Sequence, residues 1–299
     1  MPRPDSPLDM FEAHRPRLAR LAYRMLGSMA EAEDVVQDAW LRWQEVDPAG
    51  IESPGAFLSR IVTRLCLDVM KSARVRRKTY VGSWLPEPMI EEPDHVDEDD
   101  LTLTLMLALE RLSPLERAAF LLHDVFGVPL DQVADTVERD PAAVRQLAAR
   151  ARKHVQEQRP RFPVAHDEGA RIARAFFIAS RSGDTDALRS ILAENVVIRS
   201  DGGGKVLAFL NPIRGLERAL RLYEGLVRKL GLHRDGFFRP MRIDGLPGYV
   251  SLERDNVLQT TAFEIEGGRI TEIYITRNPE KLRHVAQTLN IAGHETARH

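Results

Sequence analysis

The stretch LSPLERAAFLLHDVFGVPLDQVADTVERDPAAVRQLAARARKHV, residues 112–155, decides the fold of the first half of the chain. Ser113 and Glu116 flank Pro114 as a capping box, which predicts that a helix begins here because both side chains can satisfy free backbone amides. Gly127 and Pro129 are expected to end this helix. A short second helix follows, and its apolar positions are Leu130, Val133, Ala134 and Val137.

A third helix completes the segment. Asp140 before Pro141 is an N-terminal cap, and a tight turn at 138–139 precedes it. Val144, Leu147, Ala148 and Ala151 share one face, and the other face carries Arg145, Gln146, Arg150, Arg152 and Lys153. A short helix, a tight turn and a capped basic helix predict a helix-turn-helix, whose last helix can enter the major groove of DNA. The alternative interpretation is a small helical bundle with a solvated basic face.

The same segment resembles region 4 of extracytoplasmic-function (ECF) sigma factors. The resemblance rests on LSPLERAAFLLHDVFGVPLDQVADTV followed by VRQLAARARKHV. It implies a domain at residues 105–162 that reads the −35 promoter element. Family members commonly carry Lys-Ser-Arg where this chain has Arg145-Gln146-Leu147, so the base contacts are expected to differ. The residues expected to meet this element are Arg139, Ala143, Arg145, Gln146, Arg150, Arg152 and Lys153.

Composition sets the class of protein. The 299 residues suggest two domains or three small ones, and 43% hydrophobic with 29% charged residues suits a soluble globular chain. The net charge of −2 does not by itself indicate nucleic-acid binding, although local basic patches are what a polyanion meets. Cys66 is the single cysteine, which excludes an intramolecular disulfide and fits a reducing compartment. Without an apolar leader or spanning segment, we expect a cytoplasmic protein that does not bind a membrane.

The first 80 residues are expected to form a helical domain. A helix is predicted over 8–26, with Leu8 in its apolar stripe and Gly27 at its end, and Ser28 with Glu31 caps the next helix. The second helix contains EAEDVVQDAW, which resembles sigma region 2.2. The resemblance implies docking on the clamp-helix coiled coil of the RNA polymerase β′ subunit; an ordinary solvated face is the alternative. The residues expected to dock are Asp34, Gln37, Asp38 and Trp40.

A third helix, GAFLSRIVTRLCLDVMKSARVRRK at 55–78, has a basic polar face. Seven cations against Asp68 favour binding to phosphates, although cations also gather at helix C-termini for electrostatic reasons. The helix resembles sigma regions 2.3 and 2.4, which implies contact with the −10 element. Family members often have Ala-Arg-Asn where this chain has Val62-Thr63-Arg64. The cations expected to meet DNA are Arg60, Arg64, Lys71, Arg74, Arg76, Arg77 and Lys78.

Residues 81–104 read as an acidic linker with three prolines, and such runs usually stay solvated. The region after Pro163, residues 166–299, changes character. Helices are predicted over 168–182, 185–193 and 216–230, with strands near 196–198, 206–210, 236–243, 247–253, 256–266 and 269–276, and a helix capped by Asn278-Pro279. Gly267-Gly268 is a hairpin signal. This α+β order resembles the SnoaL-like, nuclear-transport-factor-2-like cone fold. The fold class is therefore multidomain, with two all-α domains and an α+β cone.

ECF sigma factors with such a cone extension form a recognised group, and three motifs here resemble theirs. They are WLPEP at 84–88, DGGGK at 201–205 and NPEKL at 278–282. The resemblance implies that the cone regulates the sigma domains in cis, without a separate anti-sigma factor, and that core RNA polymerase (β′ clamp helices and β subunit) and promoter DNA are the partners. The expected regulatory contacts are Trp84, Leu85, Pro86, Glu87, Pro88, Asp201, Gly202, Gly203, Gly204, Lys205, Asn278, Pro279, Glu280, Lys281 and Leu282.

Catalysis is not expected. Asp201, His233, Asp235 and Asp244 are candidates by residue type, but their spacing forms neither a dyad nor a metal-ligand set. No catalytic residue, metal or cofactor is predicted. Three classes of function stay open: an alternative sigma factor regulated by its own cone, a one-component helix-turn-helix regulator with a small ligand in the cone, and an enzyme fused to a DNA-binding domain.

Overall fold

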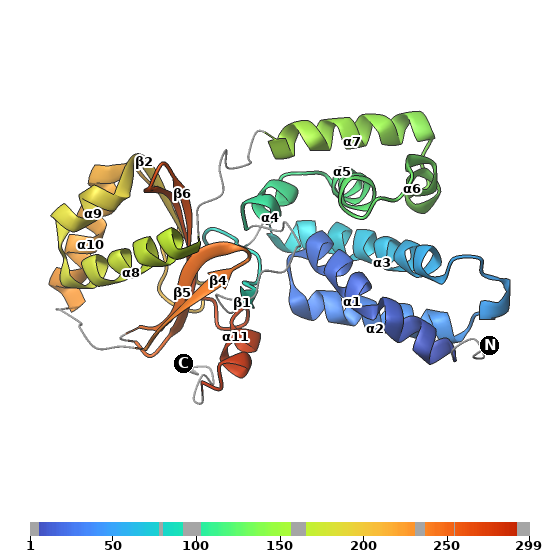
Figure 1. Ribbon diagram of the computed structural model, residues 1–299, viewed down its shortest axis with the longest axis horizontal. Coiled ribbons are helices and arrows are strands. Elements are labelled where there is room, and N and C mark those ends of the chain that lie inside the picture. The colour runs from blue at the N-terminus through green and yellow to red at the C-terminus, as the bar shows by residue number, and fades with distance from the viewer. Residues whose placement is uncertain are drawn as a thin grey trace. The chain divides into compact units, whose positions relative to one another are not determined.

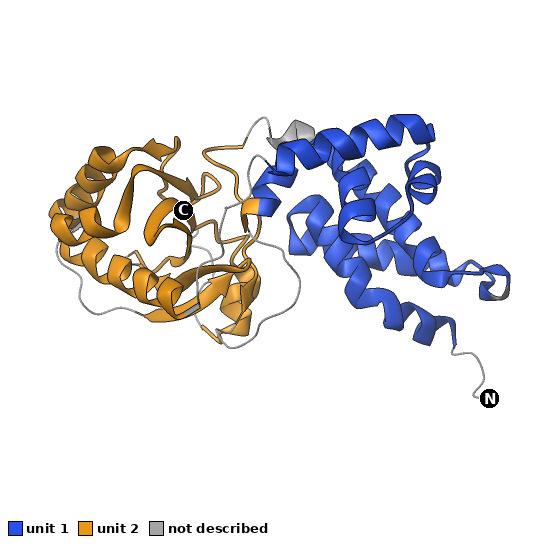
Figure 2. Cartoon of the chain, turned by 45° about the horizontal axis from the view of Figure 1, so that its top comes forward, with its two compact units in different colours: residues 1–78, 105–159 blue, residues 79–104, 160–299 orange. Residues whose placement is uncertain are grey.

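The computed structural model describes residues 6–77, 80–91, 103–156, 166–230, 237–253 and 255–291. Two compact units make up the chain: residues 1–78 with 105–159, and residues 79–104 with 160–299 (Figure 2). Helices build the first unit and a seven-stranded sheet with helices builds the second (Figure 1). This arrangement confirms the predicted fold class of helical domains plus an α+β domain. No helix among the described residues is long and apolar enough to cross a membrane.

Three helices begin the first unit: α1 (Pro7–Leu26), α2 (Met29–Gln44) and α3 (Pro54–Arg77), with the 3-10 turn η1 (Pro48–Gly50) before α3. Gly27 ends α1 at φ +70°, as predicted from the sequence, and Ser28 caps α2 by accepting a hydrogen bond from the Glu31 amide. Trp43 is fully buried and packs on Phe57, with ring centroids 5.9 Å apart. The prediction that Leu8 belongs to this core is wrong, because Leu8 lies in the first turn of α1 and is half exposed.

The second half of this unit contains the predicted helix-turn-helix. Its elements are α4 (Leu103–Glu110), α5 (Pro114–Phe120), the π-helical turn η2 (Leu121–Val125), α6 (Leu130–Val137) and α7 (Pro141–Gln156). The Ser113–Glu116 capping box is present, and its two side chains bond each other's backbone amides. Glu138 adopts a left-handed φ of +54° and makes the turn between α6 and α7. Helices α6 and α7 contact each other, and Val133, Ala134, Val144 and Ala148 are among their buried residues.

The second unit is organised by one sheet in the order β1-β4-β5-β6-β7-β2-β3. Its strands are β1 (Ile90–Glu91), β2 (Leu192–Asp201), β3 (Ile213–Arg214), β4 (Phe238–Ile243), β5 (Leu246–Leu252), β6 (Leu258–Glu266) and β7 (Arg269–Thr276). Gly267 and Gly268 both have positive φ and join β6 to β7, as a two-residue hairpin requires. Strands β2 and β7 pair in parallel, with Ser200 opposite Ile275 and Asp201 opposite Thr276.

Helices α8 (His166–Ser182), α9 (Thr185–Ile191) and α10 (Leu216–Leu230) gather on one side of this sheet (Figure 1). Aromatic side chains fill the space between them. Phe176 of α8 lies edge-on to Tyr223 of α10 at 5.3 Å and to Phe263 of β6 at 4.9 Å. The apolar core of the cone is therefore built from helices α8, α9 and α10 and the central strands.

Three sequence predictions are wrong in this unit. Residues 206–210 form no strand but a loop after the glycine-rich turn. The N-cap of helix α11 (Arg283–Thr288) is Leu282 rather than Asn278. The Asn278 side chain accepts a hydrogen bond from the Glu280 amide and closes a separate turn before the helix. The linker is not solvated throughout: residues 80–91 pack on the cone, and Ile90–Glu91 pairs with β4. The remaining linker acids lie outside the described residues.

A buried carboxylate lies in the sheet. Glu264 of β6 is 8% exposed and accepts hydrogen bonds of 3.2 Å from the hydroxyls of Thr104 and Tyr274. Burial, and then the neighbouring Glu272 carboxylate, raise the pKa of Glu264 to about 6. Arg199 pairs with Glu272 at 3.1 Å, so the charge of Glu272 is partly compensated, whereas Glu264 has no ion pair among the described residues.

This pKa predicts a pH effect on stability. The folded chain binds a proton at Glu264 more tightly than the unfolded chain. The contribution of Glu264 to the free energy of unfolding therefore falls as pH rises from about 4.5 to about 6. We expect a loss of about 2 kcal/mol across that window, from ~1.4 kcal/mol per pKa unit. Glu264→Gln should remove this part of the pH dependence in urea unfolding and should stabilise the chain at pH 8. Parallel pH profiles of the variant and the wild type would contradict the assignment.

Candidate functional site

The acidic face of α2 is open to solvent. Asp34, Gln37 and Asp38 are exposed, while Val35 and Val36 on the opposite side are buried. Trp40 is half-buried and packs on Phe11 with ring centroids 5.0 Å apart. Leu41 next to it is 54% exposed, and the sequence alone did not single it out. Together these residues form an acidic surface with an apolar border.

Three cations of the basic helix α3 have described side chains. Lys71 pairs with Asp68 at 2.8 Å on the surface, and Arg60 is half-buried. Arg64 points to the helix-turn-helix. The backbone of Arg74, Arg76 and Arg77 belongs to α3, but their side chains, and all of Lys78, lie outside the described residues. The predicted basic stripe is therefore seen only in its first half.

Arg64 is held by the end of α6. Its Nε donates to the carbonyl of Thr136 at 3.2 Å, its Nη2 donates to the carbonyl of Asp135 at 3.3 Å, and Nη2 lies 3.0 Å from a Glu138 carboxylate oxygen. A cation at the C-terminus of a helix is favoured by the helix dipole. In this state Arg64, which the sequence assigns to DNA, serves as a contact between the two helical domains of the first unit.

Two further contacts join these helical domains. Arg117 is 1% exposed, and its Nη1 donates to the carbonyl of Met25 at 2.7 Å while pairing with Glu110 at 2.6 Å. Arg17 donates to the carbonyl of Phe126 at 3.0 Å, and the guanidinium groups of Arg17 and Arg24 lie over the Phe126 ring. The arginines thus satisfy backbone carbonyls at helix ends, and the first unit packs as one body.

The basic face of α7 is exposed. Arg139, Ala143, Arg145, Gln146 and Lys153 lie on the surface of the turn and of the helix. The other two cations are engaged: Arg150 lies 3.2 Å from Glu116, and Arg152 donates to Asp124 at 2.5 Å. Arg145 lies 3.9 Å from Asp131, a loose surface pair worth little. Arg145 and Gln146 are therefore free to meet a base edge, while Arg152 braces the turn at Asp124.

The second candidate site lies on the cone, where Asp201 holds the linker. Asp201 is fully buried at the end of β2, and its carboxylate accepts from the Tyr80 hydroxyl at 2.5 Å and from the Leu85 amide at 2.9 Å. Lys281 neutralises it, with Nζ at 2.8 Å from Oδ2. Burial, and then the hydrogen bond to Asp201, raise the pKa of Tyr80, so its hydroxyl stays a donor. A single carboxylate thus binds two points of the linker.

Lys281 closes the site from the other side. Its Nζ also donates to the Leu85 carbonyl and lies over two aromatic rings, 4.2 Å from the centroid of Trp84 and 5.0 Å from that of Tyr80. Leu85 is 1% exposed. Asn278 completes the network, because its amide donates to the Tyr80 hydroxyl at 3.0 Å. The expected contact residues of WLPEP, DGGGK and NPEKL are therefore brought together around one buried ion pair.

Each of the three positions Gly202, Gly203 and Gly204 in DGGGK favours glycine for a different steric reason. A Cβ at Gly202 would lie 2.5 Å from the Val206 carbonyl oxygen, and one at Gly203 would lie 2.3 Å from the Asn278 amide nitrogen. Gly203 and Gly204 also have positive φ, which disfavours other residues. A Cβ at Gly204 would lie 3.2 Å from the Cβ of Val81 in the linker. The turn therefore lets both NPEKL and the linker approach its backbone closely.

The remaining predicted contacts fall at the edge of this network. Lys205 and Glu280 pair on the surface, and Pro86 and Pro88 are buried. The half-buried Glu87 carboxylate lies near His284 of α11, and His284 hydrogen-bonds the Pro88 backbone. Burial lowers the pKa of His284. Pro279 follows Asn278 in the turn, and Leu282 is 2% exposed.

Sequence reasoning missed Tyr80 and the true role of Asp244. The Asp244 carboxylate accepts from the Met89 amide at 3.2 Å, and its own amide donates to the Met89 carbonyl at 2.8 Å. Its φ of +46° marks a constrained turn between β4 and β5. Two of the catalytic candidates, Asp201 and Asp244, are therefore linker anchors. The other two, His233 and Asp235, lie outside the described residues.

Comparisons with known proteins agree with this layout. The chain matches the family models Sigma-70 region 2 over residues 10–77 and Sigma-70, region 4 over residues 102–155. It is 37% identical over 293 residues to the ECF RNA polymerase sigma factor SigJ of Mycobacterium tuberculosis, covering 91% of each chain. It is 31% identical over 279 residues to the probable ECF RNA polymerase sigma factor SigI of the same species, covering 91% of this chain and 93% of the relative.

A solved structure matches over both units. The crystal structure of Mycobacterium tuberculosis extracytoplasmic function sigma factor SigJ superposes with a TM-score of 0.75 at 33% identity, covering 92% of this chain and 98% of that chain. The likeness therefore includes the cone as well as the helical unit.

Proposed function

The chain belongs to the extracytoplasmic-function family of RNA polymerase sigma factors, and from this premise we propose that it binds core RNA polymerase in the cytoplasm and directs it to a promoter. The observation that carries the proposal is the pair of surfaces on the helical unit, an acidic face on α2 and a basic face on α7. A stand-alone repressor needs only the second. An enzyme is not favoured, since the two described catalytic candidates, Asp201 and Asp244, serve as anchors for the linker.

We assign the polymerase contact to α2. Asp34, Gln37, Asp38 and Trp40 would meet the β′ clamp helices, and α7 would lie near the β subunit when it reads the −35 element. The exposed Leu41 would add an apolar contact at the border of the acidic face. A mixture of apolar and charged contacts is typical of specific interfaces.

Reading of the −35 element is assigned to the exposed residues of α7. Arg145→Ala should weaken binding to the preferred sequence by about 1–3 kcal/mol if its guanidinium makes a bidentate base contact. The folded structure should be unaffected, since Arg145 has only a loose surface pair. The measurement is competition binding with promoter duplexes altered in the −35 element. Arg152→Ala is the contrasting variant, because it breaks the Asp124 contact and should lower stability instead. If Arg145→Ala only changed the salt dependence, the residue would be a phosphate contact.

The compact helical unit is proposed to be a resting state. Two promoter elements about one and a half helical turns apart lie ~50 Å from each other, so both DNA-binding domains must separate to reach them. Arg64 would then leave the carbonyls of α6 and become available to the −10 region. The contact with Glu138 is partly exposed, and opening it costs little on its own. The hydrogen bond from the buried Arg117 to the Met25 carbonyl is the stronger part of the closure.

We further propose that the cone regulates this opening in cis, without a separate anti-sigma factor. The linker segment 80–91 is held at Asp201 and Asp244, so these twelve residues do not serve as free length between the domains. A release of the linker would increase the separation that the two domains can reach. A few kcal/mol of differential contact is enough to move such an equilibrium.

The experiment compares transcription from a cognate promoter by the wild type, Trp84→Ala, and chains ending at residues 277 and 165. Trp84→Ala and the chain ending at 277 both loosen the same anchor, because the second loses Asn278 and Lys281. We expect both to change activity in the same direction at equal protein level. The chain ending at residue 165 gives the transcription activity of the helical domains without the cone. Equal activity of all four proteins would contradict regulation by the cone.

A further inference from the structure

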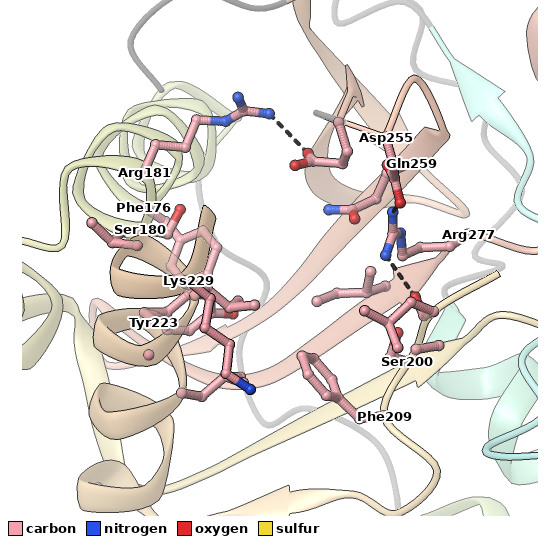
Figure 3. Close-up of a pocket in the computed structure, with 18 of the residues that line it drawn as sticks. Phe176, Ser180, Arg181, Ser200, Phe209, Tyr223, Lys229, Asp255, Gln259 and Arg277 are labelled. Carbon is pink, nitrogen blue, oxygen red and sulfur yellow. Dashed lines mark hydrogen bonds and ion pairs between the residues drawn. The ribbon is translucent and has the colours of Figure 1, made fainter. Parts of the chain in front are cut away.

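The cone contains a cavity of about 660 Å³, in the size range of small-molecule sites. In Figure 3, Phe176, Ser180, Tyr223 and Lys229 form the helical wall, and Gln259, Arg277 and Ser200 form the opposite wall. Most of the lining is apolar and comes from the middle of α10, the loop at 207–209 and the sheet. The contacts that hold the linker do not use this cavity.

Buried donors line the cavity without a partner. Ser200 is 1% exposed and Tyr223 is 6% exposed, and neither hydroxyl has a hydrogen-bond partner in the part of the chain that the structure describes. Arg277 donates through Nη1 to the Leu207 carbonyl and through Nη2 to Asp255 at 2.6 Å, while its Nε has no partner there. A buried polar group without a partner costs free energy, so such groups point to a ligand that supplies oxygen acceptors.

Charge favours an acid over a neutral molecule. Glu253 and Asp255 are the only carboxylates that line the cavity among the described residues, and both are paired with arginines. The cations that line it outnumber them; they are Arg181, Arg221, Arg228, Lys229 and Arg277. The net positive lining attracts an anion.

We propose that the cavity binds a small apolar carboxylic acid, with its carboxylate at Ser200 and Arg277 and its apolar body against Phe176 and the neighbouring wall of α10. The two anchors lie at the carboxyl ends of the adjacent parallel strands β2 and β7, since the Arg277 amide donates to the Asp201 carbonyl at 2.7 Å. Tyr223 offers a second donor from the helical wall. Burial raises the pKa of Tyr223, which keeps its hydroxyl a donor.

The position of the anchors connects this site to the linker. Ser200 and Asp201 are successive residues of β2 and so face opposite sides of the sheet. Arg277 and Asn278 directly follow β7, where Arg277 lines the cavity and Asn278 bonds Tyr80. One side of this edge therefore lines the cavity while the other holds the linker. That an acid in the cavity alters the hold on the linker rests on the proposed function, whereas binding of the acid does not.

The test uses the full chain, dodecanoate as the probe and dodecanol as the uncharged control, with calorimetry below the micellar concentration. We expect one saturable site that binds dodecanoate at least tenfold more tightly than dodecanol. Gly225→Leu should abolish binding, because a Cβ at Gly225 of α10 meets nothing within 4 Å and a larger side chain can fill the cavity without a clash. Ser200→Ala should weaken dodecanoate binding about tenfold, and Ser190→Ala, on the surface of α9, should leave it unchanged.

Absence of saturable binding, equal binding of the acid and the alcohol, or unchanged binding in Gly225→Leu would each overturn the proposal. Unfolding curves of all three variants test whether they fold. Binding is measured without polymerase, so a failure here is independent of the sigma-factor assignment. A change in promoter activity with dodecanoate would be measured separately.

Discussion

Replacing both Asp34 and Asp38 by arginine should abolish binding of the chain to core RNA polymerase while leaving its fold intact. Both side chains are exposed on α2 and face away from the buried Val35 and Val36, so the substitutions remove no packing. An acidic face is expected to meet a basic partner, and like charges placed against each other cost several kcal/mol. We therefore expect at least a 100-fold loss of affinity, which corresponds to about 2.7 kcal/mol.

The measurement is a binding titration with purified core enzyme, accompanied by circular dichroism. The matched control reverses two other exposed acids of the same domain, Glu12 and Glu52, which lie outside the face. It carries the same change in net charge and should bind normally. If the control lost as much affinity as the Asp34 and Asp38 variant, the effect would be general electrostatics rather than a docking face.

Asp201→Ala should release the linker from the cone. This carboxylate is fully buried, is paired with Lys281 and accepts the Tyr80 hydroxyl and the Leu85 amide. Removing one member of a buried ion pair costs about 3–5 kcal/mol, because the other charge is left without compensation. We expect hydrogen exchange of the backbone amides in residues 80–91 to become much faster, and transcription to change in the same direction as with Trp84→Ala.

Lys205→Ala is the control for this variant. Lys205 belongs to the same glycine-rich turn, but its pair with Glu280 is about half exposed and is worth 0–1 kcal/mol. Exchange at 80–91 should therefore be close to that of the wild type. Protection of this segment that persisted in Asp201→Ala would mean that Asp244 and β1 hold the linker by themselves.

The sequence predicts the helical unit well because its signals are local. Ser113 with Glu116, and Gly27 at the end of α1, define helix ends through contacts within a few residues. The Gly267-Gly268 hairpin is of the same kind. Each of these depends on backbone conformations that only neighbouring residues determine, so a single sequence is sufficient.

The linker site could not be predicted from such signals. Asp201 bonds Tyr80 and Leu85 across more than a hundred residues, and Asp244 bonds Met89 across an even longer separation. Composition indicated a solvated linker because acids and prolines dominate it, but the apolar residues between them, above all Leu85, find a buried place on the cone. The glycines of DGGGK were one local signal, since three in a row indicate a backbone that others approach closely. The resemblance of WLPEP, DGGGK and NPEKL to motifs of a known group indicated the same residues.

Arg64 is another residue whose partner in the structure could not be predicted from local signals. The sequence shows a cation on a basic face and favours DNA as its partner. The structure places it on the carbonyls at the end of α6, a partner that becomes visible only when two distant helices pack. Both contacts use the same donors, so they exclude each other and make Arg64 sensitive to the opening of the helical unit.

Run-off transcription with purified core RNA polymerase tests the central claim most directly. The chain should give a promoter-specific transcript from a template that carries its −35 and −10 elements. The transcript should be lost when either element is scrambled, and with the Asp34 and Asp38 variant. Binding of the chain to the promoter with no transcript from core enzyme, and with no binding to that enzyme, would contradict the account and would identify a stand-alone DNA-binding regulator.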